Sequence, residues 1–402
     1  GVILAHSTIA TYINYCSFTN NAGGVNGSVV TNSTFNQNTG SHGIMPHRIN
    51  STISGNTINN SGTYAVVIPS MLGTLTIANN VISNSPYGMR GDVQGYGGTI
   101  AVSGNQISDN GTGIFMSFYG NVQSYDGLSG TITNNTIVRN DFGIHIPVEE
   151  GDESSTLNIT SNYISNNSSG GIKITARAPV INVRYNRLHG NGSSATDGSA
   201  LYIHDNENSG LDSYEYNTVT GNTGASLIYS AGGLSTISYN NFVRGAETYT
   251  LYTHAGTDNT SNLQGSFENN WWGTTNTTNV DALIYDWNDN ATKRLIDYSP
   301  VLTVPNTTAP PAPPTNITTE LDFRNIGLTW SANAESDIAG YKIYYDTDQS
   351  GYPYANSVDV GNVTSHTLSG LNTGTTYYTA VAAYDSGSDE SWVSNESSLT
   401  TL

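Results

Sequence analysis

Charged and aromatic side chains recur at one position of a short repeated segment in the first three quarters of this 402-residue chain. If the apolar residue in the second place of each segment points inward along an extended strand, the residues one and three places after it point outward. The segments open at Gly88, Gly113, Gly143, Gly171, Ala200 and Thr250. We predict one exposed line of side chains, consisting of Arg90, Asp92, Phe115, His145, Lys173, Tyr202, His204, Tyr252 and His254.

These residue types suit an acidic polysaccharide. Arg90 and Lys173 would pair with uronate or sulfate groups, and the aromatic rings would stack against sugar faces. His145 or His204 would accept a proton near neutral pH, as β-elimination requires. The catalytic candidates are therefore His145, Lys173 and His204. A solvent-facing sheet also favours polar and aromatic residues, so this simpler interpretation stays open.

Acidic loops offer oxygen ligands in three places: residues 149–153, residues 346–351, and the group Asp286, Asn288 and Asn290. Such oxygens suit calcium, but the loop at 346–351 has Ser357 where a calcium loop carries a bidentate carboxylate. We interpret the first segment as a solvated loop and the second as a turn between strands. The sequence predicts no metal site and no cofactor, and calcium is the one ion for which these loops have ligands.

A repeat must position the exposed line. A turn residue that is followed two places later by an apolar residue recurs about every 25 residues. Strands with alternating apolar residues flank it. This period predicts a β-solenoid of about 11 coils, in which stacked coils bury their apolar faces together. The turn residues are Cys16, Ser33, Asn56, Asn80, Asn105, Asn135, Asn162, Asn186, Asn217, Asn240 and Asn269.

Asparagine has two physical reasons to recur at such a turn. It tolerates the left-handed backbone region, and its amide can bond to the equivalent amide one coil away. We therefore predict a ladder of asparagine amides along the solenoid. Cys16 lies on the same inward ladder, so we expect it to be a buried, small apolar residue.

The rest of the chain is predicted to form a linker and a second domain. Residues 299–315 are rich in proline, which predicts an extended, semi-rigid linker. The residues that follow alternate between polar and apolar types in several short strands. Trp330 lies in the second of these strands, and Tyr377 and Tyr378 lie in a later strand that follows the turn at residues 368–371.

The repeat resembles the right-handed parallel β-helix of the pectate-lyase-like superfamily over about residues 1–300. The segment 269–273, followed by Asp286 and residues 298–300, resembles the ending of many such solenoids. The tail resembles a fibronectin type III domain over residues 310–402. These resemblances imply an all-β protein with a β-helix over 1–298, a linker over 299–315 and a β-sandwich over 316–402. They also imply a sugar-binding groove along one strand of each coil.

The catalytic patterns of that superfamily are incomplete in this chain. Ser41-His42-Gly43 lacks the grouped aspartates of polygalacturonase-like enzymes, and Met45-Pro46-His47 lacks the acid of epimerase-like ones. Asp92 and Asp205 are several coils apart, although a glycosidase needs two neighbouring carboxylates.

Charge and composition limit which partners and which cellular compartment are compatible with this sequence. The net charge of -19 disfavours nucleic acid, and no apolar run is long enough for a transmembrane segment. The many Asn-x-Ser/Thr triplets fit a glycosylated extracellular or cell-surface protein. The candidate sites are Asn26, Asn32, Asn50, Asn59, Asn110, Asn134, Asn158, Asn166, Asn167, Asn191, Asn259, Asn276, Asn290, Asn306, Asn316, Asn362 and Asn395.

Two functional hypotheses follow. The first coil lacks a predicted cap, and unpaired strand edges favour association, so copies of the chain would stack end to end or side by side. The first hypothesis is an extracellular structural or adhesive glycoprotein that assembles with itself into a filament, sheath or array and binds surface glycans. The alternative is a secreted lyase or hydrolase that acts on acidic polysaccharide along the line from Arg90 to His254. The sequence begins at Gly1 without a signal segment, so we expect that a signal was removed or that further sequence precedes it.

Overall fold

The computed structural model describes residues 11–94, 97–119, 127–147, 155–175, 179–193, 198–204, 212–229, 235–245, 247–253, 265–293 and 295–402. The chain divides into two compact units, Gly1–Val301 and Leu302–Leu402. Each unit is described below by itself.

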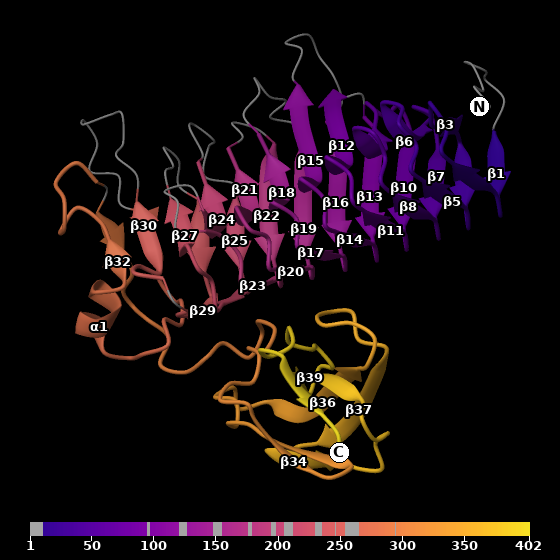
Figure 1. Cartoon of the computed structure of the whole chain (residues 1–402). Coiled ribbons are helices and arrows are strands. Elements are labelled where there is room, and N and C mark those ends of the chain that lie inside the picture. Colours follow the sequence, from indigo (N-terminus) through magenta and orange to yellow (C-terminus); the bar gives the residue numbers. More distant parts are fainter. Residues whose placement is uncertain are drawn as a thin grey trace. The chain divides into compact units, whose positions relative to one another are not determined.

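Three long parallel sheets form most of the first unit, and each of their strands pairs with the equivalent strands of the neighbouring coils (Figure 1). Sheet A consists of β1 (Tyr12–Asn14), β4 (Val29–Thr31), β7 (Ser51–Ser54), β10 (Thr74–Ala78), β13 (Thr99–Ser103), β16 (Ser129–Thr133), β19 (Thr156–Thr160), β22 (Val180–Arg184), β25 (Ser213–Glu215) and β28 (Thr236–Ser238). Sheet B consists of β2 (Ser17–Thr19), β5 (Thr34–Asn36), β8 (Thr57–Asn59), β11 (Val81–Ser83), β14 (Gln106–Ser108), β17 (Thr136–Val138), β20 (Tyr163–Ser165), β23 (Arg187–His189), β26 (Thr218–Thr220) and β29 (Asn241–Val243).

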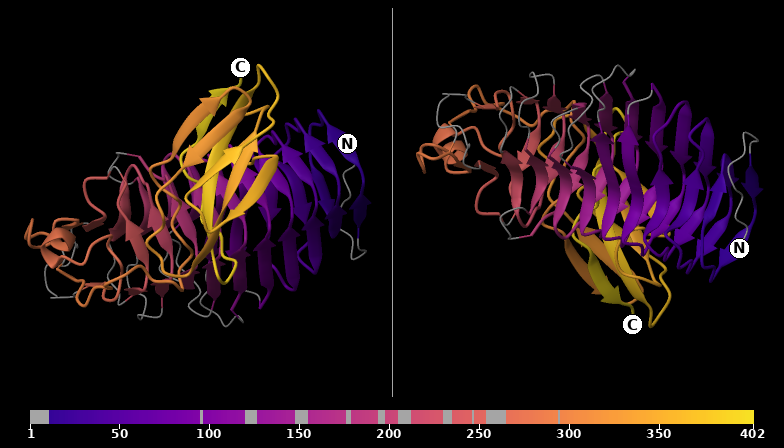
Figure 2. Two further views of the ribbon diagram at one scale, coloured as in Figure 1. Left: turned by 90° about the horizontal axis from the view of Figure 1, so that it is seen from below. Right: turned by 90° about the horizontal axis from the view of Figure 1, so that it is seen from above.

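Sheet C carries the predicted line of side chains. It consists of β3 (Val25–Gly27), β6 (His42–Pro46), β9 (Tyr64–Ile68), β12 (Tyr87–Gln94), β15 (Thr112–Tyr119), β18 (Phe142–Ile146), β21 (Gly170–Ile174), β24 (Ser199–Ile203), β27 (Ala225–Tyr229), β30 (Leu251–Thr253) and β32 (Ile284–Tyr285). The chain visits sheets A, B and C in turn, and each circuit adds one strand to each sheet (Figure 2). The predicted β-solenoid is confirmed.

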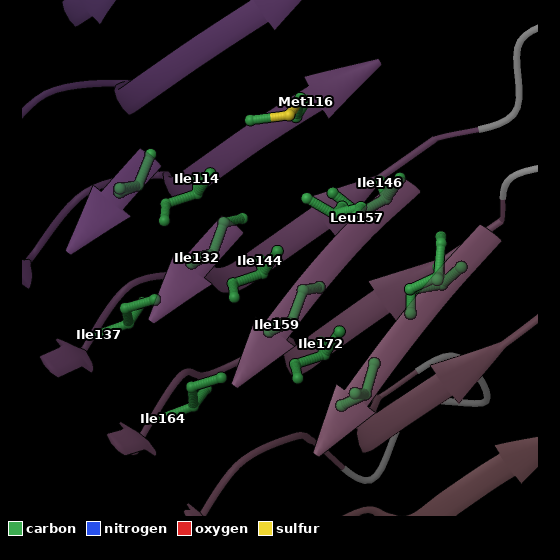
Figure 3. Packing of buried hydrophobic residues seen from close by; sticks show 14 of the residues in the cluster. Ile114, Met116, Ile132, Ile137, Ile144, Ile146, Leu157, Ile159, Ile164 and Ile172 are labelled. Atoms are coloured by element: carbon green, nitrogen blue, oxygen red, sulfur yellow. The ribbon is translucent and has the colours of Figure 1, made fainter. Parts of the chain in front are cut away.

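The core is a set of apolar stacks that run along the solenoid between the sheets. Parallel pairing in register places Ile132 beside Ile159 in sheet A and Ile137 beside Ile164 in sheet B. Ile144 and Ile172 form the same kind of pair in sheet C, and all these side chains are fully buried (Figure 3). A coil therefore buries its apolar residues chiefly against the coils on either side of it.

The predicted asparagine ladder is present at the turn between sheets A and B. The Asn135 amide donates to the Asn162 side-chain oxygen at 3.0 Å, and its own oxygen accepts from the Asn105 backbone and side chain. The left-handed conformation falls on the preceding residue of the turn, as at Asn134 with φ 55°, and the prediction that the ladder asparagine itself adopts it was wrong. The last ladder residue is accordingly Asn270, whereas Asn269 takes the left-handed position.

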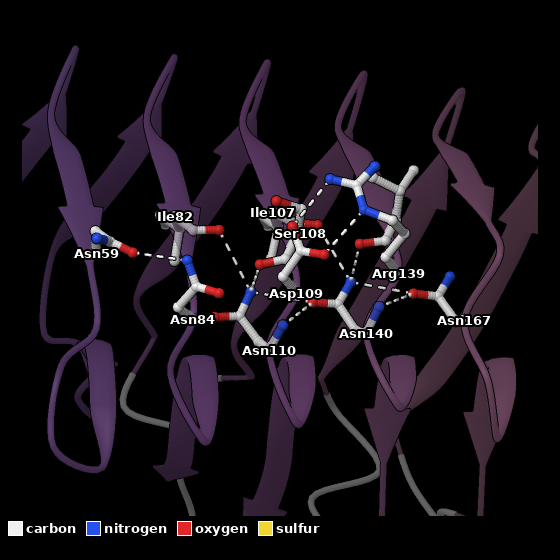
Figure 4. A network of polar contacts seen from close by, with 11 residues as sticks. Asn59, Ile82, Asn84, Ile107, Ser108, Asp109, Asn110, Arg139, Asn140 and Asn167 are labelled. Carbon is white, nitrogen blue, oxygen red and sulfur yellow. Dashed lines mark hydrogen bonds and ion pairs between the residues drawn. The ribbon is translucent and has the colours of Figure 1, made fainter. Parts of the chain in front are cut away.

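A second ladder, which the sequence did not reveal, lies at the turn between sheets B and C. Asn110 donates through its side-chain amide to Asn140, and Asn140 donates to Asn167, at 3.0 Å in both cases (Figure 4). The Asn167 amide continues the series to Asn191 at 2.9 Å. Both turns are thus held by side-chain amides that replace missing backbone partners.

Cys16 is exposed, contrary to the prediction of a buried residue. It lies between β1 and β2, the first strands of sheets A and B among the described residues. Within that part of the chain, the Cys16 backbone nitrogen donates to the Ser33 hydroxyl at 3.1 Å, and no earlier coil covers its side chain.

The segment after β30 closes the last coils. Trp272 is buried and packs on Phe242 with ring centroids 5.0 Å apart. Helix α1 (Thr277–Asp281) follows the N-cap residue Asn276, whose side-chain oxygen accepts from the backbone nitrogen of Thr278. Strands β31 (Gly265–Ser266) and β33 (Ile296–Asp297) add a short parallel pair.

The second unit consists of two antiparallel sheets. One contains β34 (Thr318–Asp322), β35 (Asn325–Thr329) and β38 (Ser365–Leu368); the other contains β37 (Asn356–Gly361), β36 (Ile338–Asp346), β39 (Thr376–Asp385) and β40 (Ser397–Thr400). Trp330 and Tyr341 pack in the core between them, with ring centroids 5.5 Å apart.

Part of the proline-rich segment belongs to this unit. The Ala312 backbone nitrogen donates to Glu335 at 2.8 Å, and Thr315 accepts from the Ser331 nitrogen at 2.9 Å. The division into two compact units falls between Val301 and Leu302. The residues around 312–315 are therefore attached to the sandwich, and the predicted linker over 299–315 is too long.

Candidate functional site

Strand register brings six of the predicted side chains onto one line across the outer face of sheet C. We call this line the sheet C row; in order, it consists of Arg90, Phe115, His145, Lys173, Tyr202, Ile228, Tyr252 and Tyr285. Adjacent strands lie about 4.8 Å apart, so Arg90 and Tyr252, six strands apart, span roughly 29 Å. Two members, Ile228 and Tyr285, were not predicted, and Ile228 is buried.

Arg90 lies among three aromatic rings. Its guanidinium carbon is 4.6 Å from the ring centroid of Phe115 and 5.2 Å from that of Tyr87, and Tyr64 lies slightly further away at 5.5 Å. Asp92 forms an ion pair with the guanidinium nitrogen Nη2 at 3.4 Å, which is long for a hydrogen bond. Burial lowers the pKa of Arg90, but Coulombic attraction to Asp92 and the hydrogen bond that Arg90 donates to this carboxylate outweigh it, so the pKa is raised. The cation thus packs among three aromatic rings and forms an ion pair with one carboxylate.

Lys173 forms a second cation–aromatic group three strands away. Its ammonium lies 5.0 Å from the ring centroid of Tyr202 and 5.6 Å from that of Phe142. His145, its neighbour in the row, packs edge-on against Phe115 at 5.3 Å. Burial, with a smaller contribution from the Lys173 charge, lowers the pKa of His145 to about 4. His145 is therefore neutral at pH 7.

A third group lies at the far end of the row and involves a residue that the sequence did not single out. The Lys293 ammonium is 4.8 Å from the ring centroid of Tyr252 and 5.7 Å from that of Tyr285. The two tyrosine rings stack at 4.8 Å with 4° between their planes. Lys293 comes from the closing segment rather than from a repeated coil, so no periodic pattern could have placed it on the row.

The other predicted members lie off the row. Asp92 pairs in register with Ser117, whose hydroxyl donates to it at 2.8 Å. Ser117 is fully buried, so it presents no surface to a ligand. His204 follows β24 and is half-buried, two residues beyond Tyr202. The row therefore brings together His145 and Lys173 but not His204, and His254 lies outside the described residues.

The acidic loops serve as turns where the structure describes them. Asp346 accepts from the backbone nitrogens of Thr347 and Ala355, and Asp286 accepts from those of Asn288 and Ile296. Residues 149–153 lie outside the described residues. Within the described part of the chain, no cluster of three or more His, Cys, Asp or Glu could hold a metal ion.

Three of the candidate glycosylation sites are incompatible with the fold. Asn110, Asn167 and Asn191 are buried members of the second ladder. A glycan on any of them would break the ladder and has no space beside the neighbouring coils. Asn259 lies outside the described residues. The remaining candidates are exposed or half-buried: Asn26, Asn32, Asn50, Asn59, Asn134, Asn158, Asn166, Asn276, Asn290, Asn306, Asn316, Asn362 and Asn395.

In the described residues, no helix has both the length and the apolar character needed to cross a membrane.

Comparisons with known proteins match the two units separately. A family model of the right-handed β-helix region matches residues 42–208, and one of the fibronectin type III domain matches residues 312–397. A Kelch domain-containing protein of Saccharolobus solfataricus is 38% identical over 77 residues, which make up 19% of this chain and 10% of that protein. This chain thus spans about a tenth of that relative's length.

Two solved structures resemble 23% of the chain each. One is an Fn3-like protein from Clostridium thermocellum, 31% identical with a TM-score of 0.20 and 96% of its chain covered. The other comprises the FN1–FN3 domains of chicken CNTN1, 26% identical with a TM-score of 0.22 and 32% of its chain covered. β-Helix and fibronectin type III domains are typical of extracellular-type proteins with adhesive or enzyme-like roles. The chain consists of a right-handed parallel β-helix followed by a fibronectin type III domain.

Proposed function

We propose that this protein is an extracellular adhesive protein that binds an anionic polysaccharide along the sheet C row. The observation that carries the proposal is the alignment of Arg90, Lys173 and Lys293 with aromatic rings on one face. A long row perpendicular to the strands suits an extended polymer better than a compact ligand. Assembly of several copies would raise the avidity of such a surface without new contacts.

The chemistry of the row favours sugars with acidic groups. Aromatic side chains have large apolar faces against which a pyranose ring can pack, and the cations provide charge-assisted hydrogen bonds to carboxylate or sulfate. Arg90 and Lys173 are already positioned by the rings around them. Less side-chain entropy is therefore lost when a ligand binds. The net charge of -19 repels any polyanion at long range, so the proposed binding rests on the local cations and rings of this row.

Binding is better supported than catalysis. A proton acceptor with a pKa of about 4, such as His145, is a weak general base at neutral pH. The sheet C row itself contains no carboxylate, and Asp92, on the same strand as Arg90, accepts hydrogen bonds from Arg90 and Ser117. Among the described residues, the row does not bring together the two neighbouring carboxylates that a glycosidase uses.

Affinity electrophoresis in gels with dextran sulfate or neutral dextran tests this proposal. Dextran sulfate should retard the protein, and neutral dextran should not. The double variant Arg90→Gln with Lys173→Gln should bind at least about tenfold more weakly, because it loses two charge-assisted contacts. The control is Arg139→Gln with Lys342→Gln, which changes the net charge equally but removes cations paired with Asp109 and Glu390 elsewhere.

Equal retardation of the two double variants would overturn the proposal. A parallel assay with polygalacturonate tests the enzymatic alternative. If the wild-type protein released unsaturated products and the variant with Arg90 and Lys173 replaced did not, the row would be an active site.

A further inference from the structure

Three cations lie along the sheet C row at a regular interval: its members Arg90 and Lys173, and Lys293, which lies over its member Tyr252. From Arg90 to Lys173 the register passes through Phe115 and His145, which makes three strand steps. From Lys173 to Tyr252, over which the Lys293 ammonium lies, it passes through Tyr202 and Ile228, again three steps. With strands about 4.8 Å apart, the positive charges repeat roughly every 14 Å.

The positions between the cations carry no positive charge at neutral pH. Phe115 and His145 occupy the first interval, and burial keeps the His145 ring neutral at pH 7. Tyr202 and the buried Ile228 occupy the second interval. Arg90 lies over the Phe115 ring and Lys173 over the Tyr202 ring, while His145 and Ile228 add no cation among the described row residues, so each positive charge is shared by three strands.

This pattern selects between kinds of anionic polymer. A pyranose unit in an extended chain advances by about one strand spacing, so a ligand along the row places one sugar over each strand. A polymer with an acid on every sugar would bring three acids to each cation, so two of every three acids would lack a cationic partner. Desolvating a charge without a partner is costly, whereas a neutral sugar stacks there favourably.

We propose that the sheet C row recognises a heteropolysaccharide in which an anionic sugar recurs at every third position and neutral sugars lie between. This inference rests on the proposed function and specifies its ligand. The row thereby gains specificity from the unfavourable placement of extra charges as well as from the favourable contacts.

A matched series of oligosaccharides tests the spacing. The probes are β-1,4-linked nonasaccharides of glucose in which glucuronate replaces no unit, every third unit, every second unit or every unit. Isothermal titration calorimetry with the full chain at neutral pH gives each affinity. The nonasaccharide charged at every third unit should bind about tenfold more tightly than the fully charged one, because it avoids unpaired carboxylates.

Variants locate the effect on the row. Lys173→Gln removes the central cation and should weaken binding of the every-third probe about tenfold. Lys342→Gln, a lysine of the other unit, should leave that affinity unchanged. Higher salt should weaken the binding, since the contacts are electrostatic.

Two failures are distinguishable. If the fully charged or the every-second probe bound as tightly as the every-third probe, and Lys173→Gln weakened all of them, the spacing inference would be wrong and the proposed function would stand. If no charged probe bound, or if Lys173→Gln changed none of the affinities, the sheet C row would not be the binding site and both proposals would fail.

Discussion

His145 and Lys173 are directly paired in register on β18 and β21, so a histidine and a lysine are side by side on one face of the sheet. Burial is the larger reason for the low pKa of His145, about 4, and the lysine charge is the smaller one. The arrangement stabilises the neutral imidazole and leaves Lys173 as the charged member of the pair.

This relationship predicts the titration of His145 in variants. In the native protein, the ring signals should titrate near pH 4, as followed by NMR. In Lys173→Gln, the pKa of His145 should rise but stay below 6.5, because burial remains after the charge is lost. Lys342→Gln should leave it unchanged. An unchanged value in Lys173→Gln would contradict the assigned electrostatic contact.

Asp92→Asn should strengthen binding of an anionic polysaccharide. The Asp92 carboxylate partly neutralises Arg90 and repels an incoming acid, and asparagine keeps the acceptor that the Ser117 hydroxyl uses. We expect an affinity gain of severalfold, roughly 1 kcal/mol, for dextran sulfate. Asp109→Asn, which breaks the ion pair with Arg139 away from the row, is the matched control. Equal gains in both variants would indicate a general effect of net charge, and weaker binding in Asp92→Asn would contradict the role given to Arg90.

The solenoid could be predicted from the sequence because every coil has the same structural requirements. Each coil needs an inward apolar residue on each strand and an amide at the turn, so both signals recur about every 25 residues. The exact turn residue could not be assigned at Asn134-Asn135 or Asn269-Asn270, because either asparagine of a pair suits both the left-handed position and the ladder. Stacking neighbours decide between them.

The second ladder and the third cation were missed for different reasons. In the second ladder, serine occupies two rungs, at Ser61 and Ser85, which obscures the asparagine pattern. Lys293 reaches the row from a closing segment that belongs to no repeat. Strand alternation placed Arg90 and His145 on one face, but the burial that makes His145 a weak base depends on packing that no local pattern encodes.

The buried ladder can be tested with two adjacent residues. Asn135→Ala removes the oxygen that accepts from the Asn105 backbone and amide, and the donor to Val102 and Asn162. Several buried groups then lack partners, so unfolding in urea should show a loss of about 3 kcal/mol. Asn134→Gly is the control, because Asn134 is exposed and glycine adopts its positive φ readily. If the two variants were equally stable, the ladder would contribute little.

The last prediction concerns acid stability and rests on His189, which bonds to the Thr220 hydroxyl at 2.8 Å near the turn between sheets B and C. Burial lowers the pKa of His189 to about 4 from 6.5. The unfolded chain therefore binds more protons between those values, so the contribution of this group to stability is present above pH 6.5 and is lost as the pH falls toward 4.

His189→Gln should accordingly reduce the pH dependence of solenoid unfolding in that window by about 1–3 kcal/mol. Glutamine keeps a polar group for Thr220 but does not titrate. The variant therefore separates the effect of protonation on stability from the effect of the hydrogen bond. His366→Gln, in the other unit, is the control and should leave the solenoid transition as it is in the wild type. Urea unfolding at several pH values between 6.5 and 4 measures the difference. An unchanged slope in His189→Gln would mean that His189 does not bind a proton on unfolding, and that the acid sensitivity arises from other groups such as His145.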